Sequence, residues 1–324
     1  MSNFWKNKNV FVTGGNGFIG SWLTKGLVEK GARVVVLQRD ITKDNILKIQ
    51  GIRDKITLVI GDLLDYYLLE RILNEYGIKY CFHLAAQAIV EVANKLPLST
   101  FESNIRGTWQ LLEACRCSKT IEGVVVASSD KAYGIHEELP YTENHPLLGL
   151  YPYDASKACV DILARSYYET YDLPVVVTRK TNVYGGADLN MNRIIPGTIC
   201  SVLKGETPII RSDGTPERDY MYIKDAVNAY LIIGENLDRS DVVGQAFNFG
   251  TGQPISVLDL FNKIIRLCGK DVKPKILNKA KDEIPRQYLS SEKAKRILNW
   301  KAQYSLEEGL KKTIEWYKEH FREI

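Results

Sequence analysis

Runs of β-branched and other apolar residues alternate along the first half of the chain with segments whose apolar residues recur every three or four positions. The runs predict buried strands, and the three- and four-residue spacing predicts amphipathic helices. The expected strands are 9–13, 33–37, 56–60, 80–84, 123–128 and 174–179, and the expected helices include 66–76 and 101–117. This order predicts an α/β fold with a Rossmann doubly wound parallel sheet and helices on both faces. Six strands are enough for a full sheet of this kind.

The pattern loosens from about Gly185, where prolines separate shorter elements (Pro196, Pro208, Pro216, Pro254, Pro274, Pro285). We predict a Rossmann domain over residues 1–184 and a smaller mixed α/β substrate lobe over 185–324, with some strands and helices interchanged. Ligands of such folds bind outside the carboxyl ends of the strands, so we expect the lobe to cover that edge.

Residues 13–20 read Thr-Gly-Gly-Asn-Gly-Phe-Ile-Gly and follow the first expected strand. Glycines let the backbone turn tightly there, and they let a phosphate approach the free N–H groups at a helix start. The glycines fit GxGxxG from Gly15 and GxxGxxG from Gly14. The residues expected to hold a dinucleotide are Gly14, Gly17, Phe18, Ile19 and Gly20.

The second expected strand ends before Gln38, Arg39 and Asp40. An acid directly after this strand usually binds the ribose 2′-hydroxyl of NAD, whereas an arginine can neutralise the 2′-phosphate of NADP. Because Arg39 comes before Asp40, we predict NADP, with NAD as the alternative that Asp40 would favour.

Tyr153 and Lys157 stand four residues apart near the start of a predicted helix that runs to about Tyr171, so they share one face. A nearby ammonium and an oxidised nicotinamide lower the pKa of a phenol from its ordinary value of about 10. Tyr153 can then take the proton of an alcohol as hydride leaves. Ser129, after the valines 124–126, can bond both the reacting hydroxyl and the Tyr153 oxygen.

The chain resembles the extended short-chain dehydrogenase/reductases that act on nucleotide sugars. The motifs that carry the resemblance, in order, are the glycine segment, Gly61-Asp62-Leu63, His83-Leu84-Ala85-Ala86, Asn104, Ser129-Asp130-Lys131, Tyr153 to Lys157 and Arg179 to Gly185. The resemblance implies further cofactor contacts from Asp62, Leu63, Ala85, Ala86 and Asn104, besides Tyr153 and Lys157. It also implies a cofactor that stays bound and is regenerated in each turnover.

Residues 129–133, 182–188 and 192–196 look most like CDP-glucose 4,6-dehydratase. Epimerases lack an acid pair at this step, so Asp130 and Lys131 favour dehydration. After oxidation at C4 of the sugar, this pair would remove the C5 proton and protonate O6 to expel water. Hydride would then return to C6 or C4, giving a 4-keto-6-deoxy or a 5,6-ene sugar.

Residues 217–222 depart from the CDP-glucose pattern, which has Arg-Pro-Trp there, and are similar to UDP- and dTDP-sugar enzymes. We therefore predict a UDP-sugar, with UDP-N-acetylglucosamine first, as in the dehydratases of pseudaminic-acid routes. The alternatives are a CDP-glucose 4,6-dehydratase, then a UDP-sugar 4-epimerase. A non-catalytic dinucleotide sensor is the alternative from another class, but it has no use for Ser129, Tyr153 and Lys157 together.

The expected substrate contacts lie in or near the second lobe. Arg193 and Arg218 would hold the substrate pyrophosphate, because a guanidinium fork matches phosphate oxygens. Asn182 resembles the asparagine that the family places beside the phosphates, and Ile194 follows Arg193 in the same motif.

Composition indicates which classes of binding partner are disfavoured. The net charge of +4 comes from 43 basic and 39 acidic residues without like-charge runs, which disfavours nucleic acid or a membrane surface. We expect a cytoplasmic protein with reduced cysteines and no metal, because cysteines and histidines show no metal-ligand spacing. A homodimer or higher homo-oligomer is expected through helices at about 98–117 and 153–171, which carry apolar residues beyond one face (Trp109, Leu111, Leu112, Val160, Ile162, Leu163).

Overall fold

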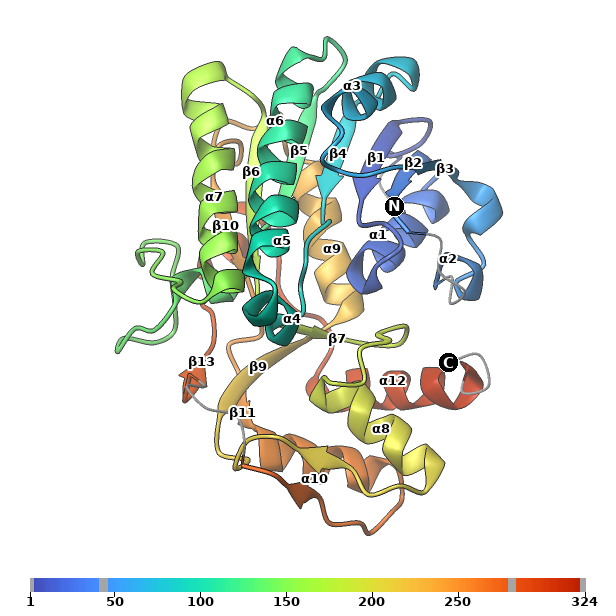
Figure 1. The fold of residues 1–324 in the computed structure, drawn as a ribbon, viewed down its shortest axis with the longest axis vertical. Coiled ribbons are helices and arrows are strands. Elements are labelled where there is room, and N and C mark those ends of the chain that lie inside the picture. The colour runs from blue at the N-terminus through green and yellow to red at the C-terminus, as the bar shows by residue number, and fades with distance from the viewer. Residues whose placement is uncertain (1–2, 41–45, 279–283, 321–324) are drawn as a thin grey trace.

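The computed structural model describes residues 3–40, 46–278 and 284–320, and its centre is a seven-stranded parallel sheet (Figure 1). The strand order is β10-β6-β5-β4-β1-β2-β3. The bounds are β1 Asn9–Thr13, β2 Arg33–Gln38, β3 Thr57–Ile60, β4 Tyr80–His83, β5 Gly123–Ala127, β6 Val175–Lys180 and β10 Ala246–Phe249. The Rossmann prediction is confirmed, with the six expected strands in place.

Helices cover both faces of this sheet, because its strands bury side chains on both sides. Val125 and Val176 pack on one face in the core that includes Leu23 of α1 (Phe18–Glu29) and Ala226 of α9 (Ile223–Gly234). Val124 packs on the other face with residues of α3 (Tyr66–Glu75), α6 (Gly107–Cys117) and α7 (Pro152–Tyr171). The remaining helices near the sheet are α2 (Ile46–Ile49), α4 (Val90–Lys95) and α5 (Pro97–Phe101).

The sheet contains one strand more than the sequence predicts. β10 pairs in parallel with β6, Ala246 opposite Val177, and it comes from the region assigned to the second lobe. α9 also lies beyond residue 184 and packs against α1. Two elements from beyond residue 184 therefore pack with the sheet, and the division of the chain at residue 184 stays a prediction.

The expected helix over 101–117 is divided. α5 leads into a π-helical turn at Glu102–Arg106, and only then does α6 begin at Gly107. π-Helical turns are rare in proteins, and those that occur are often found at functional sites. This turn carries Asn104.

The second lobe lies below the sheet in Figure 1. Its strands are β7 (Asn182–Tyr184), β8 (Ile209–Ile210), β9 (Glu217–Tyr222), β11 (Pro254–Ser256), β12 (Lys275–Ile276) and β13 (Arg286–Gln287). Its helices are α8 (Ile194–Lys204), α10 (Val257–Leu267) and α12 (Leu306–His320), whereas α11 (Glu292–Leu298) packs against β10 of the central sheet. β9 pairs with β7, β11 and β13, so the lobe is built around this strand.

Two further observations concern the described residues. None of their helices has the length and apolar character needed to cross a membrane. All six cysteines are free.

Candidate active site

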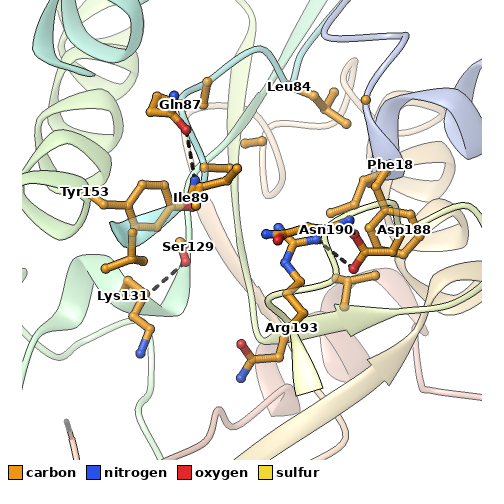
Figure 2. Close-up of a pocket in the computed structure, with 18 of the residues that line it drawn as sticks. Phe18, Leu84, Gln87, Ile89, Ser129, Lys131, Tyr153, Asp188, Asn190 and Arg193 are labelled. Atoms are coloured by element: carbon orange, nitrogen blue, oxygen red, sulfur yellow. Dashed lines mark hydrogen bonds and ion pairs between the residues drawn. The ribbon is translucent and has the colours of Figure 1, made fainter. Parts of the chain in front are cut away.

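A crevice of about 1190 Å³ runs along the carboxyl ends of the sheet strands and is closed on the other side by the second lobe. Figure 2 shows Tyr153, Ser129 and Lys131 on one side and Arg193 with Asp188 opposite them. Sites for one small molecule have volumes of roughly 300–1,000 Å³. The crevice is large enough for two ligands, a dinucleotide and a substrate.

The glycine segment lines the crevice with its backbone. Gly14 has φ +70°, and a Cβ there would lie 2.7 Å from the Ala85 nitrogen. A Cβ at Gly20 would collide with the Gly14 carbonyl. Gly17 is the N-cap of α1 and has no side chain to cap the first N–H groups, which leaves them available to an anion. Gly14, Gly17 and Gly20 line the crevice and Gly15 does not, which favours the GxxGxxG reading, and Phe18, Ile19 and Ala86 line the crevice as well.

Arg39, Asp40, Asp62 and Leu63 line the crevice at the ends of β2 and β3. Arg39 Nε lies 2.8 Å from Asp40 Oδ2, and each side chain is 63% exposed. Asp62 Oδ1 accepts a hydrogen bond from the Leu64 N–H at 2.9 Å. The two groups that could distinguish NADP from NAD therefore form an ion pair with each other.

Tyr153 and Lys157 both face the crevice from the first turns of α7. Lys157 Nζ donates to the Ala127 carbonyl at 2.8 Å, and burial lowers the pKa of Lys157 to about 8. Burial raises the pKa of Tyr153 to about 12, although a hydrogen bond with Ser129 acts in the opposite direction. The serine, tyrosine and lysine predicted from sequence are thus brought together.

Asp130 and Lys131 lie beside this set in a short 3₁₀ turn after β5. Asp130 is 4% exposed, and its Oδ1 accepts from Ser129 Oγ at 3.0 Å. Its Oδ2 is buried and has no hydrogen-bond partner within the described chain. Burial raises the pKa of Asp130, while the Lys131 charge opposes that rise.

The expected substrate residues line the lobe side of the crevice. Arg193, the N-cap of α8 just before Ile194, is 40% exposed and pairs with Asp188 at 2.9 Å. Arg218 is buried, with its Nη1 donating to the Glu217 carbonyl at 2.8 Å. Asn182 Nδ2 donates to the Asp219 carbonyl at 3.4 Å.

Asn104 is placed differently from the other expected cofactor residues, because it does not line the crevice. Its Oδ1 accepts from the Gln87 N–H at 2.7 Å, and its Nδ2 donates to Ser156 Oγ at 2.9 Å. It therefore joins a crevice-lining segment to α7. Its contact with the cofactor stays a prediction.

Several crevice residues were not found from sequence. Asp154, directly after Tyr153, and Lys180, at the end of β6, line the crevice, and Gln287 of β13 lies behind it and bonds to Lys131. Burial raises the pKa of Asp154 to about 6. Lys180 carried a usable signal, since it lies three positions after a run of valines, as Ser129 does.

Comparison with known proteins decides the family. Residues 11–313 match the family model described as GDP-mannose 4,6 dehydratase. The chain belongs to this family of extended short-chain dehydrogenase/reductases. CDP-glucose 4,6-dehydratase of Salmonella typhimurium is 30% identical over 336 residues, 99% of this chain and 93% of that protein.

Two solved structures resemble this family member closely. UDP-glucose 4-epimerase of Thermotoga maritima, with UDP-glucose, has a TM-score of 0.89 at 30% identity, covering 97% of this chain and 99% of that one. dTDP-glucose 4,6-dehydratase of Bacillus anthracis, in complex with NAD, has a TM-score of 0.85 at 28% identity, covering 97% and 98%.

Proposed function

We propose that the protein is a nucleotide-sugar 4,6-dehydratase with a bound nicotinamide dinucleotide. The observation that carries the proposal is one shared crevice, in which Ser129, Tyr153 and Lys157 lie beside Asp130 and Lys131. The first set suits oxidation of an alcohol, and the second suits removal of water. An epimerase would need only the first.

The crevice fits the cofactor on its own geometry. Side chains at Gly14 or Gly20 would fill the space of neighbouring backbone, and the α1 N-terminus is open to a pyrophosphate. A nicotinamide bound here supplies a hydride acceptor that later returns the hydride. Relatives in complex with NAD support this choice.

For the oxidation, Tyr153 removes the proton from O4 of the sugar. Its pKa of about 12 in the cofactor-free protein is too high for this task near neutral pH. The Lys157 ammonium lowers that pKa once the crevice is filled, because a positive charge favours the phenolate. Ser129 holds the sugar hydroxyl and the phenol oxygen in line.

For the elimination, a C4 ketone makes the C5 proton acidic. Lys131 takes that proton and Asp130 donates one to O6, so that water leaves and protons balance. The burial that raises the pKa of Asp130 favours its protonated form. The Oδ2 atom without a partner supports donation to the substrate. The reverse assignment balances equally, because coupled groups titrate as a pair.

We propose UDP-N-acetylglucosamine as the first substrate to test, with Arg193 and Arg218 at the pyrophosphate. CDP-glucose is the second, and the relative from Salmonella typhimurium supports it. NADP is proposed over NAD on the strength of Arg39.

The test is mass spectrometry after incubation of the purified protein with UDP-N-acetylglucosamine, CDP-glucose or dTDP-glucose in deuterated water. A dehydratase removes one water and exchanges the C5 proton. Tyr153→Phe should abolish both changes. Interconversion at C4 with no mass change would instead identify an epimerase and contradict the proposal.

A further inference from the structure

A third lysine lies in the crevice beside Lys131 and Lys157, and the mechanism above does not use it. Lys180 ends β6, lines the crevice and is 5% exposed. Its Nζ donates to Thr178 Oγ1 at 2.5 Å and lies 3.3 Å from the centre of the Tyr230 ring of α9. The Thr178 hydroxyl also bonds with the Tyr230 phenol. The amine is therefore held in one place.

The surroundings of this amine are unusual for a lysine. Tyr230 of α9 and Phe249 of β10 present ring faces to it, and Thr178 of its own strand presents a hydroxyl. The charged neighbour is Lys157 of α7, of the same sign. The described carboxylates form no ion pair with it. Burial and Lys157 together lower the pKa of Lys180 well below its ordinary value.

Lys180 lies at the part of the crevice where the nicotinamide half of a dinucleotide would bind. The glycine segment follows β1 in the middle of the sheet, and Arg39 and Asp62 follow β2 and β3 on one side of it. With its pyrophosphate at the glycine segment and its adenosine toward β2 and β3, a dinucleotide extends its other half toward β5 and β6. Ser129 and Lys180 lie at the ends of those two strands, and Lys157 of α7 bonds to the Ala127 carbonyl of β5.

We propose that Lys180 is a proton-accepting site whose charge follows the redox state of the nicotinamide. The oxidised ring is positive, and beside it and Lys157 the amine stays neutral. When hydride passes from C4 of the sugar to the ring, the ring loses its charge, and Tyr153 takes the O4 proton. Lys180 then takes one further proton from water, and it returns that proton when hydride leaves the ring.

The groups around Lys180 suit both of its states. The neutral amine needs only one acceptor, which Thr178 provides. The ammonium gains the face of the Tyr230 ring, an interaction that strengthens away from water. The added charge stabilises the reduced ring relative to the oxidised one, so hydride remains on the cofactor while the sugar loses water. The inference rests on the proposed nicotinamide cofactor, and it does not depend on the identity of the sugar.

The experiment measures the equilibrium ratio of reduced to oxidised bound cofactor at a series of pH values and without sugar, against a reference couple that exchanges electrons only and whose potential does not change with pH. Two-electron reduction of the nicotinamide consumes one proton and changes this ratio about tenfold per pH unit, and a second coupled proton steepens it toward roughly a hundredfold. We expect the steeper dependence in the wild type. Lys180→Met should return it to about tenfold.

Lys293→Met is the matched control. Its Nζ also lies over an aromatic ring, 4.7 Å from the centre of Phe247, and bonds to the Ala246 carbonyl at 2.9 Å, but it does not line the crevice. It should keep the wild-type slope. Lys180→Gln, which retains a donor to Thr178, serves if the methionine variant does not fold.

Equal slopes in the wild type and the Lys180 variants would overturn this inference and leave the dehydratase proposal standing. A wild type that binds no nicotinamide would overturn both.

Discussion

Gln287 joins the second lobe to Asp130 and Lys131, the proposed acid–base pair. Its Oε1 accepts a hydrogen bond from Lys131 Nζ at 2.7 Å, and its Nε2 donates to the Asp130 carbonyl at 3.1 Å. The contacts span more than 150 positions of the chain, so they fix the lysine only in the folded protein. Gln287 thus acts through Lys131 and is a positioning residue.

Gln287→Leu should slow water loss by about tenfold, the value of one hydrogen bond, while oxidation at C4 continues. The two steps separate in deuterated water, because formation of reduced cofactor reports oxidation and mass reports dehydration. Gln253→Leu, on an exposed loop, is the control. Equal loss of both steps would mean that Gln287 only supports the fold.

Lys131→Met should stop water loss and exchange at C5 while leaving the Tyr153-dependent oxidation intact. General acid–base catalysis contributes roughly 10²- to 10⁴-fold, which sets the expected loss. Lys270→Met, at an exposed position, should be neutral. Dehydration within about threefold of the wild type on that scale would show Lys131 to be a structural neighbour only.

Lys157→Met should stabilise the cofactor-free protein and abolish its activity. The pKa of Lys157 is about 8 in the folded state, below the ordinary value of 10.5. Near neutral pH the ammonium is charged in both states, so its burial destabilises the fold by up to roughly 3 kcal/mol. As pH rises from about 8, the folded state loses the proton first, and stability rises.

Urea unfolding at several pH values checks this prediction. The wild type should gain stability between about pH 8 and 10.5 relative to Lys157→Met, because the variant lacks this group. A variant that is less stable at neutral pH, with the same pH dependence as the wild type, would contradict it.

The cofactor choice depends on the Arg39–Asp40 pair. Arg39→Ala should weaken NADP binding by about 10- to 100-fold, the effect of losing charge-assisted hydrogen bonds to a phosphate. Asp40→Ala should weaken NAD instead. The measurement is titration of cofactor-free protein with each dinucleotide, followed by identification of what the untreated protein releases on denaturation. Release of NAD alone, with unchanged binding in Arg39→Ala, would make the NADP prediction wrong.

The predicted dimer seam divides into two kinds of residue. Leu111, Leu112 and Val160 are buried against the protein's own sheet, whereas Trp109 is 42% exposed and Ile162 is 55% exposed. The exposed pair remains available to a second copy. The double variant Trp109→Glu, Ile162→Glu should be a folded monomer by light scattering. A monomeric wild type at micromolar concentration would end the dimer hypothesis.

Much of the fold and of the site could be predicted from short segments of the sequence. The valine runs of β5 and β6 predict buried parallel strands, and the groups that follow them predict the crevice. β10 escaped prediction because Asn248 interrupts its apolar run and because it lies in the region where the alternation of strands and helices has loosened. The contact of Gln287 with Lys131 also escaped prediction, because the two residues lie far apart in the sequence.

The position of Asn104 illustrates a different limit. The sequence places it in a helix, but a π-helical turn changes the direction in which its side chain points. Nothing in residues 102–106 marks that turn. The polar groups that it joins, Gln87 and Ser156, lie far from it in the sequence.

The return of the chain to the sheet in α9 and β10 also determines how the protein can be divided. A fragment ending at residue 184 would keep every expected cofactor-binding residue and the whole catalytic set. It would lose α9, which packs on β5 and β6, and would expose Val125 and Val176 to water. Such a fragment should aggregate rather than bind a dinucleotide. Shorter versions of this protein therefore have to keep α9 and β10, and residues can be removed only from the second lobe.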